Sequence, residues 1–180
     1  MKTPEEMAKQ QTACNAFFNR TDLCFMFTPE MIANMHKDLV AEFGGSHGVR
    51  DIKMLESAVQ APYAAFGDEV FYKTHAERGA RFGYSLIANH PFIDGNKRTG
   101  MVGMLGLLKA NGVNLSYTSD EIFDIIIQVA DGKADYEELL GWVNDHTVKT
   151  KGVMVKDMPK LRESALKDAI NKLSEHDKLN

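Results

Sequence analysis

The sequence has few cysteines, no excess of positive charge and no secretory signal, and each shortage excludes a class of protein. Two cysteines, Cys14 and Cys24, stand among 180 residues without metal-like pairing, so neither a disulfide framework nor a cysteine-based metal site is expected. A net charge of -4 leaves no basic excess to replace the counterions of a nucleic acid, which makes direct nucleic-acid binding an unfavoured hypothesis. The expected compartment is the reduced cytoplasm.

Long apolar runs are also missing. The longest, MVGMLGLLKA at 101–110, is too short to span a bilayer and contains Gly103 and Gly106. Because it is apolar nearly all round, it predicts a helix that is buried among other helices. Glycines at positions 100, 103 and 106 predict a face that a neighbouring helix can approach closely. We expect a mainly α fold, a helical bundle around this central helix, with no membrane role.

Helix signals recur along the rest of the chain. TPEE at 3–6 and TPEM at 28–31 each place a threonine at an N-cap and a proline at N1. The second of these helices is expected to end at Gly44-Gly45, and others are expected over 51–60, 75–90, 118–127 (opened by the capping box TSDE) and 136–143. The positions expected to face the core at 28–60 are Met31, Ile32, Met35, Leu39, Val40, Ile52, Leu55 and Val59.

Segment 63–74, YAAFGDEVFYKT, lacks a helical period. Aromatic and β-branched residues flank Gly67-Asp68, a pattern that predicts a small β-hairpin or flap. Its larger side chains are Tyr63, Phe66, Val70, Phe71 and Tyr72.

Polar chemistry is concentrated in HPFIDGNKRTG, residues 90–100, just before the apolar helix. His90 precedes a proline, which disfavours the helical conformation and forces a turn. Asp94 or Asn96 can cap the next helix. The amides from Gly95 through Arg98 then point out of its N-terminus and form a cradle for a phosphate.

The side chains of this loop suit phosphate chemistry. Lys97 and Arg98 add positive charge at the cradle, and Arg98 can grip a phosphate in bidentate fashion. Asp94 offers a carboxylate oxygen to Mg²⁺. His90 titrates near neutral pH and can act as a general base toward a hydroxyl. Phe92 is expected to pin the loop to the core. The other histidines, His36, His47, His75, His146 and His176, show no ligand spacing and are interpreted as structural or solvated.

HPFIDGNKR, residues 90–98, resembles the signature of the Fic/Doc family at all nine positions. The upstream stretch FGGSHGVRDIKMLESAVQAP and the downstream stretch LKANGVNL resemble the Doc (death-on-curing) branch, so that the resemblance covers roughly residues 28–147. We therefore predict a Fic/Doc domain over 28–147, an N-terminal helical extension over 1–27, and a linker with an amphipathic helix over 148–180.

The resemblance implies a role for each motif residue. His90 would deprotonate a hydroxyl of a target protein, Asp94 would hold Mg²⁺ on the phosphates of ATP, and Gly95, Asn96, Lys97 and Arg98 would bind those phosphates. The flap residues Tyr63, Phe66, Val70, Phe71 and Tyr72 would hold a target segment as an added strand. The target of Doc-like members is a threonine of elongation factor Tu, whose phosphorylation stops translation, and a cognate antitoxin is the implied partner.

Two departures separate this motif from Fic enzymes that transfer AMP. Those enzymes have glycine where this chain has Lys97, and a second arginine where it has Met101. Both differences favour the Doc branch and phosphoryl transfer. Three alternatives stay open: protein adenylylation, a nucleotide- or partner-binding module without turnover, and a Mg²⁺-dependent phosphohydrolase, although the last needs more metal ligands than the loop offers. A P-loop is excluded because its glycine-lysine pattern is absent.

The C-terminal stretch 158–176 has helical spacing and is interpreted as a docked amphipathic helix, with a regulatory or oligomerising helix as the alternative. The chain has no Ser/Thr followed four residues later by Glu, which is the spacing of the inhibitory helix in many Fic proteins. We therefore expect inhibition in trans by an antitoxin, with self-inhibition by residues 158–176 as the second hypothesis.

Overall fold

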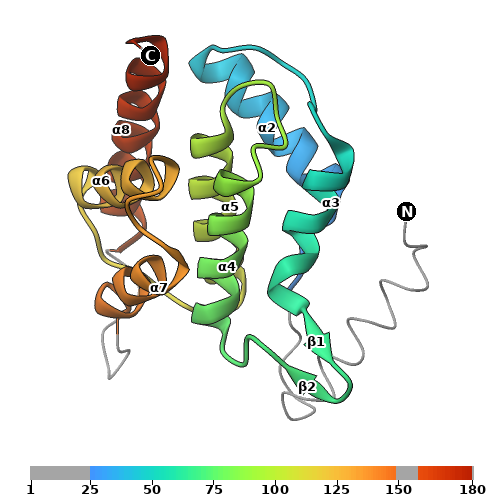
Figure 1. The fold of residues 1–180 in the computed structure, drawn as a ribbon. Helices are drawn as coiled ribbons and strands as arrows, with labels where there is room; N and C mark the ends of the chain where they lie inside the picture. The colour runs from blue at the N-terminus through green and yellow to red at the C-terminus, as the bar shows by residue number, and fades with distance from the viewer. Residues whose placement is uncertain (1–24, 149–157, 180) are drawn as a thin grey trace.

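The computed structural model describes residues 25–148 and 158–179, with side chains of the last helix from residue 164 on. The described part is mainly helical with one small two-stranded sheet, as the sequence predicts (Figure 1). Its elements are α2 (Pro29–Phe43), α3 (Ile52–Gln60), the 3-10 turn η1 (Ala61–Tyr63), β1 (Ala65–Phe66), β2 (Glu69–Val70), α4 (His75–Ala88), α5 (Asn96–Ala110), α6 (Ser119–Ala130), α7 (Tyr136–Asp145) and α8 (Met158–Leu179). The helix predicted to begin at residues 3–6 lies outside the described residues.

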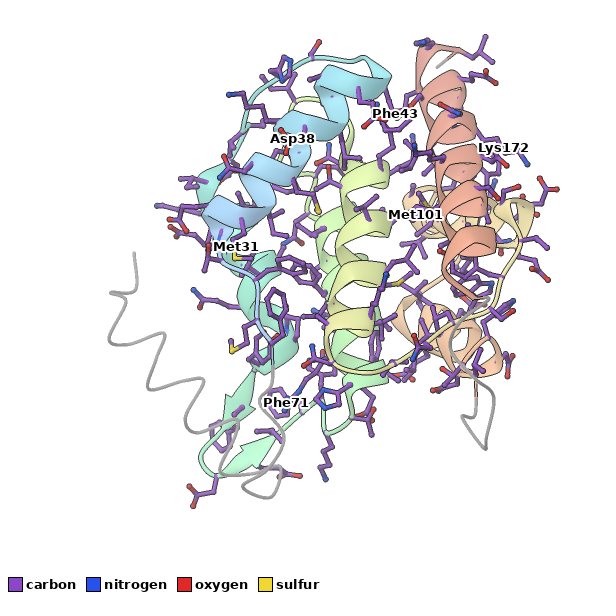
Figure 2. All side chains as sticks on the ribbon, turned by 180° about the vertical axis from the view of Figure 1, so that it is seen from behind. Met31, Asp38, Phe43, Phe71, Met101 and Lys172 are labelled. Carbon is purple, nitrogen blue, oxygen red and sulfur yellow. The ribbon has the colours of Figure 1, made fainter. Side chains whose placement is uncertain are left out.

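Helices α4 and α5 form the middle of the bundle. Figure 1 shows α2 and α3 on one side of this pair and α6, α7 and α8 on the other. The apolar side chains of α5 are buried on more than one side, as expected: Met101, Met104, Leu107 and Leu108 are at most 1% exposed. In Figure 2, Met101 lies between α5 and α8.

Glycines let α4 and α5 approach closely. A Cβ added at Gly100 would lie 2.5 Å from Cγ1 of Ile87 and 3.1 Å from the carbonyl oxygen of Gly83. A Cβ at Gly83 would lie 2.8 Å from Cβ of Met104. The close face predicted from the glycine spacing of α5 is therefore present, and α4 contributes glycines of its own to it.

Local signals set the helix ends where they were predicted. Thr28 caps α2 by accepting the amide of Met31, and Gly44 follows its last residue with a φ of 83°. Thr118 and Glu121 form the predicted capping box of α6. Thr74 and Glu77 form another at the start of α4, the helix that leads into the motif.

Two residues predicted to face the core are exposed instead. Met31 is 41% exposed and Ile52 is 47% exposed. Met31 lies about 100° around the helix from the fully buried Ile32, at the border of the buried arc. Ile52 is the first residue of α3, and burial begins one turn later, at Leu55.

The predicted flap is a short antiparallel hairpin. Ala65 pairs with Val70 and Phe66 pairs with Glu69. The turn between them contains Gly67, whose φ of 60° is a left-handed value that glycine adopts without strain.

The last helix, α8, packs against the bundle, which confirms the docked interpretation of its apolar stripe. Ala169, Ile170 and Leu173 are at most 4% exposed and belong to the same cluster as Met101. Lys172, labelled in Figure 2, pairs with Asp120 of α6. The preceding arm, residues 149–157, lies outside the described residues.

None of the described helices is both long enough and apolar enough to cross a membrane.

The α4–α5 contact gives a stability prediction. Gly100→Ala is expected to lower the free energy of unfolding by about 1–3 kcal/mol, because the new methyl group meets both a side chain and a backbone carbonyl. The control is Gly141→Ala in α7, where nothing lies within 4 Å of the added Cβ, and this substitution should raise stability by about 0.5–1 kcal/mol. Urea unfolding of both variants measures the difference. Equal stabilisation by the two alanines would contradict the close packing.

Candidate active site

The motif begins with a strained backbone. His90 has a φ of 46°, a left-handed value that a non-glycine residue rarely adopts. Helix α4 ends at Ala88, and only Asn89 and His90 separate it from Pro91, so the chain must turn within these residues. Such conformations persist only where surrounding contacts hold them, and they are frequent at functional sites.

The loop between α2 and α3, residues 44–50, supplies those contacts. The amides of Arg50 and Asp51 donate to the carbonyl of Pro91 at 2.8 and 3.1 Å, and the amide of Ile93 donates to the carbonyl of Gly48 at 3.0 Å. A Cβ at Gly48 would lie 2.7 Å from Cδ1 of Ile93. The sequence predicted only a helix end here. The glycines of this loop were the sequence signal that it also packs against the motif, because two backbones can approach closely only where side chains are small.

Beneath the loop, Phe92 and His36 stack with ring centroids 4.0 Å apart. Phe92 is 1% exposed, which confirms that it pins the loop to the core. Nε2 of His36 lies 3.0 Å from the carbonyl oxygen of Asp94. A carbonyl can only accept, so Nε2 carries the proton and donates. Burial lowers the pKa of His36, which favours this neutral form and makes the residue structural.

The expectation that Asp94 or Asn96 caps α5 is wrong. The N-cap is Gly95, with a φ of 71° and no side-chain cap. The side-chain amide of Asn96 is already used across the loop, since its Oδ1 accepts from the backbone amide of Phe92 at 2.9 Å and its Nδ2 donates to the carbonyl of Phe92 at 3.0 Å. The Asp94 carboxylate accepts instead from the amides of Gly95 and Ser46.

The start of α5 still offers an anion site. Thr99 is the first residue of the motif whose amide donates within the helix, to the carbonyl of Gly95 at 2.9 Å. In the part of the chain that the structure describes, the amides of Asn96, Lys97 and Arg98 have no acceptor. These are the free donors that a helix N-terminus presents to a phosphate.

The two motif cations are held close to this N-terminus. Arg98 is 2% exposed and donates through Nη1 to the carbonyl of Gly44 at 2.7 Å. Its Nη2 lies 3.7 Å from the carboxylate of Asp94. Asp94 supplies the carboxylate of the motif, and 32% of its side chain is accessible to solvent.

An acidic residue of α8 also contacts both cations. Oδ1 of Asp177 lies 2.6 Å from Nζ of Lys97, and Oδ2 lies 3.7 Å from Nε of Arg98. No local sequence pattern points to Asp177, which stands 80 positions from Lys97. A phosphate that bound Lys97 and Arg98 would have to compete with the carboxylate of Asp177.

His90 is exposed at the surface, yet its surroundings favour the neutral imidazole. Partial burial lowers the pKa of His90, and the positive charges of Arg50 and Lys97 lower it further. A base must be unprotonated to accept a proton, so the shift leaves His90 ready for that role at neutral pH. Among the described residues, no group of three or more His, Cys, Asp or Glu could hold a metal by itself.

The flap residues divide into two sets. Phe66 and Phe71 are 82% and 56% exposed, and Figure 2 shows Phe71 at the end of the molecule that carries the hairpin. Tyr63 and Tyr72 instead hold the hairpin to α4, because Arg78 lies 5.5 Å over the ring of Tyr63 and donates to the carbonyl of Tyr72 at 3.0 Å. The first set is available to a target and the second set anchors the flap.

Two comparisons with known proteins bear on this site. A model of the Fic/DOC family matches residues 26–108, which include the flap and the whole motif. The toxin Doc of Mycolicibacterium smegmatis is 33% identical over 99 residues, which make up 54% of this chain and 76% of that protein. The chain belongs to the Fic/Doc family. Both α8 and Asp177 lie outside the stretch that the Fic/Doc family model matches.

The charges around His90 give a titration prediction for this Fic/Doc motif. The pKa of His90 is expected below the ordinary value of 6.5, so the ring should stay neutral at pH 7 and gain its proton only as the pH falls further. Lys97→Gln should raise this pKa toward the ordinary value, because it removes one positive charge. NMR titration of His90 measures both values, with Lys109→Gln at the far end of α5 as the control. A His90 pKa above 6.5 would contradict the described surroundings.

Proposed function

We propose that this Fic/Doc protein is a toxin of a toxin–antitoxin system and that it transfers the terminal phosphoryl group of ATP to a hydroxyl of a target protein. The observation that carries the proposal is that His90, whose pKa is lowered by partial burial and by nearby cations, lies in the same loop as a helix N-terminus with free amides and two cations. Likeness to the toxin Doc supports the toxin assignment.

His90 would take the proton of the attacking hydroxyl. His90 is exposed to solvent, and contacts with loop 44–50 hold the adjoining backbone in place. Phosphoryl transfer depends mainly on positioning and on stabilising charge. The rigid support beneath the loop, where Asn96 and His36 bind its backbone, suits that requirement.

The phosphates would lie at the start of α5. The amides of Asn96, Lys97 and Arg98 would bind phosphate oxygens, and the side chains of Lys97 and Arg98 would add positive charge. Asp94 is a fitting carboxylate ligand for Mg²⁺, because this ion typically binds through one or two carboxylates together with substrate phosphates. When bound, the ion would neutralise charge on those phosphates.

Phosphoryl transfer is favoured over adenylyl transfer by two residues. Lys97 puts a bulky cationic side chain at the phosphate cradle, in the position where AMP-transferring members of the family have glycine. Met101 is fully buried and apolar, so α5 has no cation one turn after Lys97. Protein adenylylation is the second candidate because the base and cradle would serve either reaction. A binding module without turnover is disfavoured, since each residue of the motif is present.

The protein target is proposed from resemblance. A threonine of elongation factor Tu is the hydroxyl that Doc-like members phosphorylate, and such a reaction would take place in the cytoplasm and block translation. The exposed Phe66 and Phe71 on the hairpin are suited to hold a target segment alongside the flap.

Label transfer tests the reaction. The protein is incubated with a bacterial lysate and ATP labelled at either the α or the γ phosphate, and we expect γ label on a protein. His90→Ala should lower the rate by about 10²–10⁴-fold, as for the loss of a general base, with circular dichroism unchanged. An α label would indicate adenylylation, and no label from either ATP would leave the binding module. Transfer by His90→Ala at the wild-type rate would remove His90 from the mechanism.

Control of the activity has two candidate routes. Inhibition in trans by a cognate antitoxin is proposed from likeness to the toxin Doc. Self-inhibition by the C-terminal helix is favoured by Asp177, whose carboxylate neutralises Lys97 and Arg98 where phosphate would bind. Removing residues 150–180 is a poor test, because Ala169, Ile170 and Leu173 of α8 belong to the core.

A point substitution separates the two routes. Asp177→Asn should lower the KM for ATP by about fivefold, the equivalent of roughly 1 kcal/mol for one partly buried ion pair. Glu175→Gln is the control, because it makes the same change of charge at an exposed position of the same helix. An unchanged KM for Asp177→Asn would exclude self-inhibition through this carboxylate and leave the antitoxin route.

A further inference from the structure

Arg50 is an exposed cation bound to the motif on both sides of His90. Its amide donates to the carbonyl of Pro91 at 2.8 Å. Its Nη2 donates to the carbonyl of Asn89 at 3.4 Å. Its positive charge lowers the pKa of His90 more than that of Lys97 does. The hydrogen bond to Asn89 holds the guanidinium at the residue that directly precedes His90, although Arg50 stands 40 positions before His90 in the chain.

The guanidinium of Arg50 is the least engaged of the cations around His90. Lys97 and Arg98 are each paired with Asp177, and Arg98 also binds the carbonyl of Gly44. Within the described residues, no carboxylate pairs with Arg50. Its single side-chain hydrogen bond is long, whereas a guanidinium has five N–H donors. Most of its donors are open to a ligand.

We propose that Arg50 binds the phosphoryl group that is transferred, next to His90. This inference rests on the proposed function. A general base must lie about 3 Å from the attacking oxygen, and that oxygen must lie about 3–3.5 Å from the phosphorus. A cation bonded to the residue before His90 would therefore be near the oxygens of the reacting phosphoryl group. The amides of α5 would bind the other phosphates of the nucleotide.

The role fits the charge that develops in the reaction. The target oxygen forms a bond to the terminal phosphorus, the bond from that phosphorus to the bridging oxygen breaks, and ADP leaves with the electron pair. The hydroxyl proton passes to His90. Arg50 keeps its own proton throughout and donates two hydrogen bonds to the phosphoryl oxygens, where its planar fork suits bidentate binding. Because Met101 is apolar and buried, α5 supplies no cation of its own beyond its first turn at this place.

A purely structural role explains less. The anchoring of loop 44–50 to Pro91 uses the backbone amide of residue 50, which any residue other than proline would provide. The side-chain bond to Asn89 is too long to contribute much. These contacts do not explain why residue 50 is an arginine, and its guanidinium is available to bind an anion.

The test compares Arg50→Gln, Arg50→Lys and, as the matched control, Lys53→Gln, which removes the same charge from an exposed position at the start of α3. Calorimetric titration with ATP in Mg²⁺ buffer measures binding, and γ-label transfer at saturating ATP measures the rate. Arg50→Gln should lower the saturated rate at least tenfold with an unchanged melting temperature, because charged hydrogen bonds of this kind are lost. Arg50→Lys should restore only part of it, and Lys53→Gln should stay within twofold of wild type.

Each outcome decides one question. An Arg50→Gln variant with the wild-type rate and affinity overturns the role of Arg50 and leaves the proposed function intact. An equal loss in Lys53→Gln, or full activity in Arg50→Lys, overturns a specific contact in favour of general charge. If the wild-type protein binds ATP but transfers no label, the proposed transfer fails. In that case a tenfold weaker affinity of Arg50→Gln for ATP still supports Arg50 as a phosphate ligand, and an unchanged affinity overturns it.

Discussion

The close contact between α4 and α5 is the constraint on which the site depends. Glycines at positions 79, 83 and 100 let the two helices approach until side chains of one touch the backbone of the other. The motif is the connection between these helices, so their separation sets the distance that the loop must cover. The packing of the two helices therefore sets where the loop starts and where it ends.

A short polar loop cannot hold itself in one conformation, and here other elements do so. Loop 44–50 forms hydrogen bonds with the backbone of Pro91 and Ile93. The stacked rings of Phe92 and His36 support the motif on its buried side. The side chain of Asn96 closes the loop on itself through both backbone groups of Phe92. None of these contacts uses the backbone amides of Asn96, Lys97 and Arg98, so these amides remain available to an anion.

The charges of the site are nearly balanced without a ligand. Asp94 and Asp177 lie against Arg98, and Asp177 also holds Lys97. A polyphosphate that bound Lys97 or Arg98 would therefore compete with a carboxylate for that cation. This competition connects the C-terminal helix, which lies outside the stretch matched by the family model, to the chemistry of the motif. Packing of Leu173 and its neighbours into the core places that carboxylate within reach.

Local physical rules in the sequence determined the helix ends at Thr28, Gly44 and Thr118, the hairpin turn at Gly67, the forced turn before Pro91 and the set of motif side chains. Each of these depends on residues within a few positions of one another, and a cap or turn needs no more. The helix cap of α5 was missed because Asn96 binds Phe92 instead, and Met31 and Ile52 were misplaced because coverage by neighbours cannot be read from periodicity alone. Only the tertiary structure decided that His36, 58 positions from Asp94, supports the loop, that Arg50 bonds to Asn89, and that Asp177 reaches Lys97. These contacts join distant segments, and packing of the whole bundle, with its helix spacing set by side-chain volume, determines which segments meet.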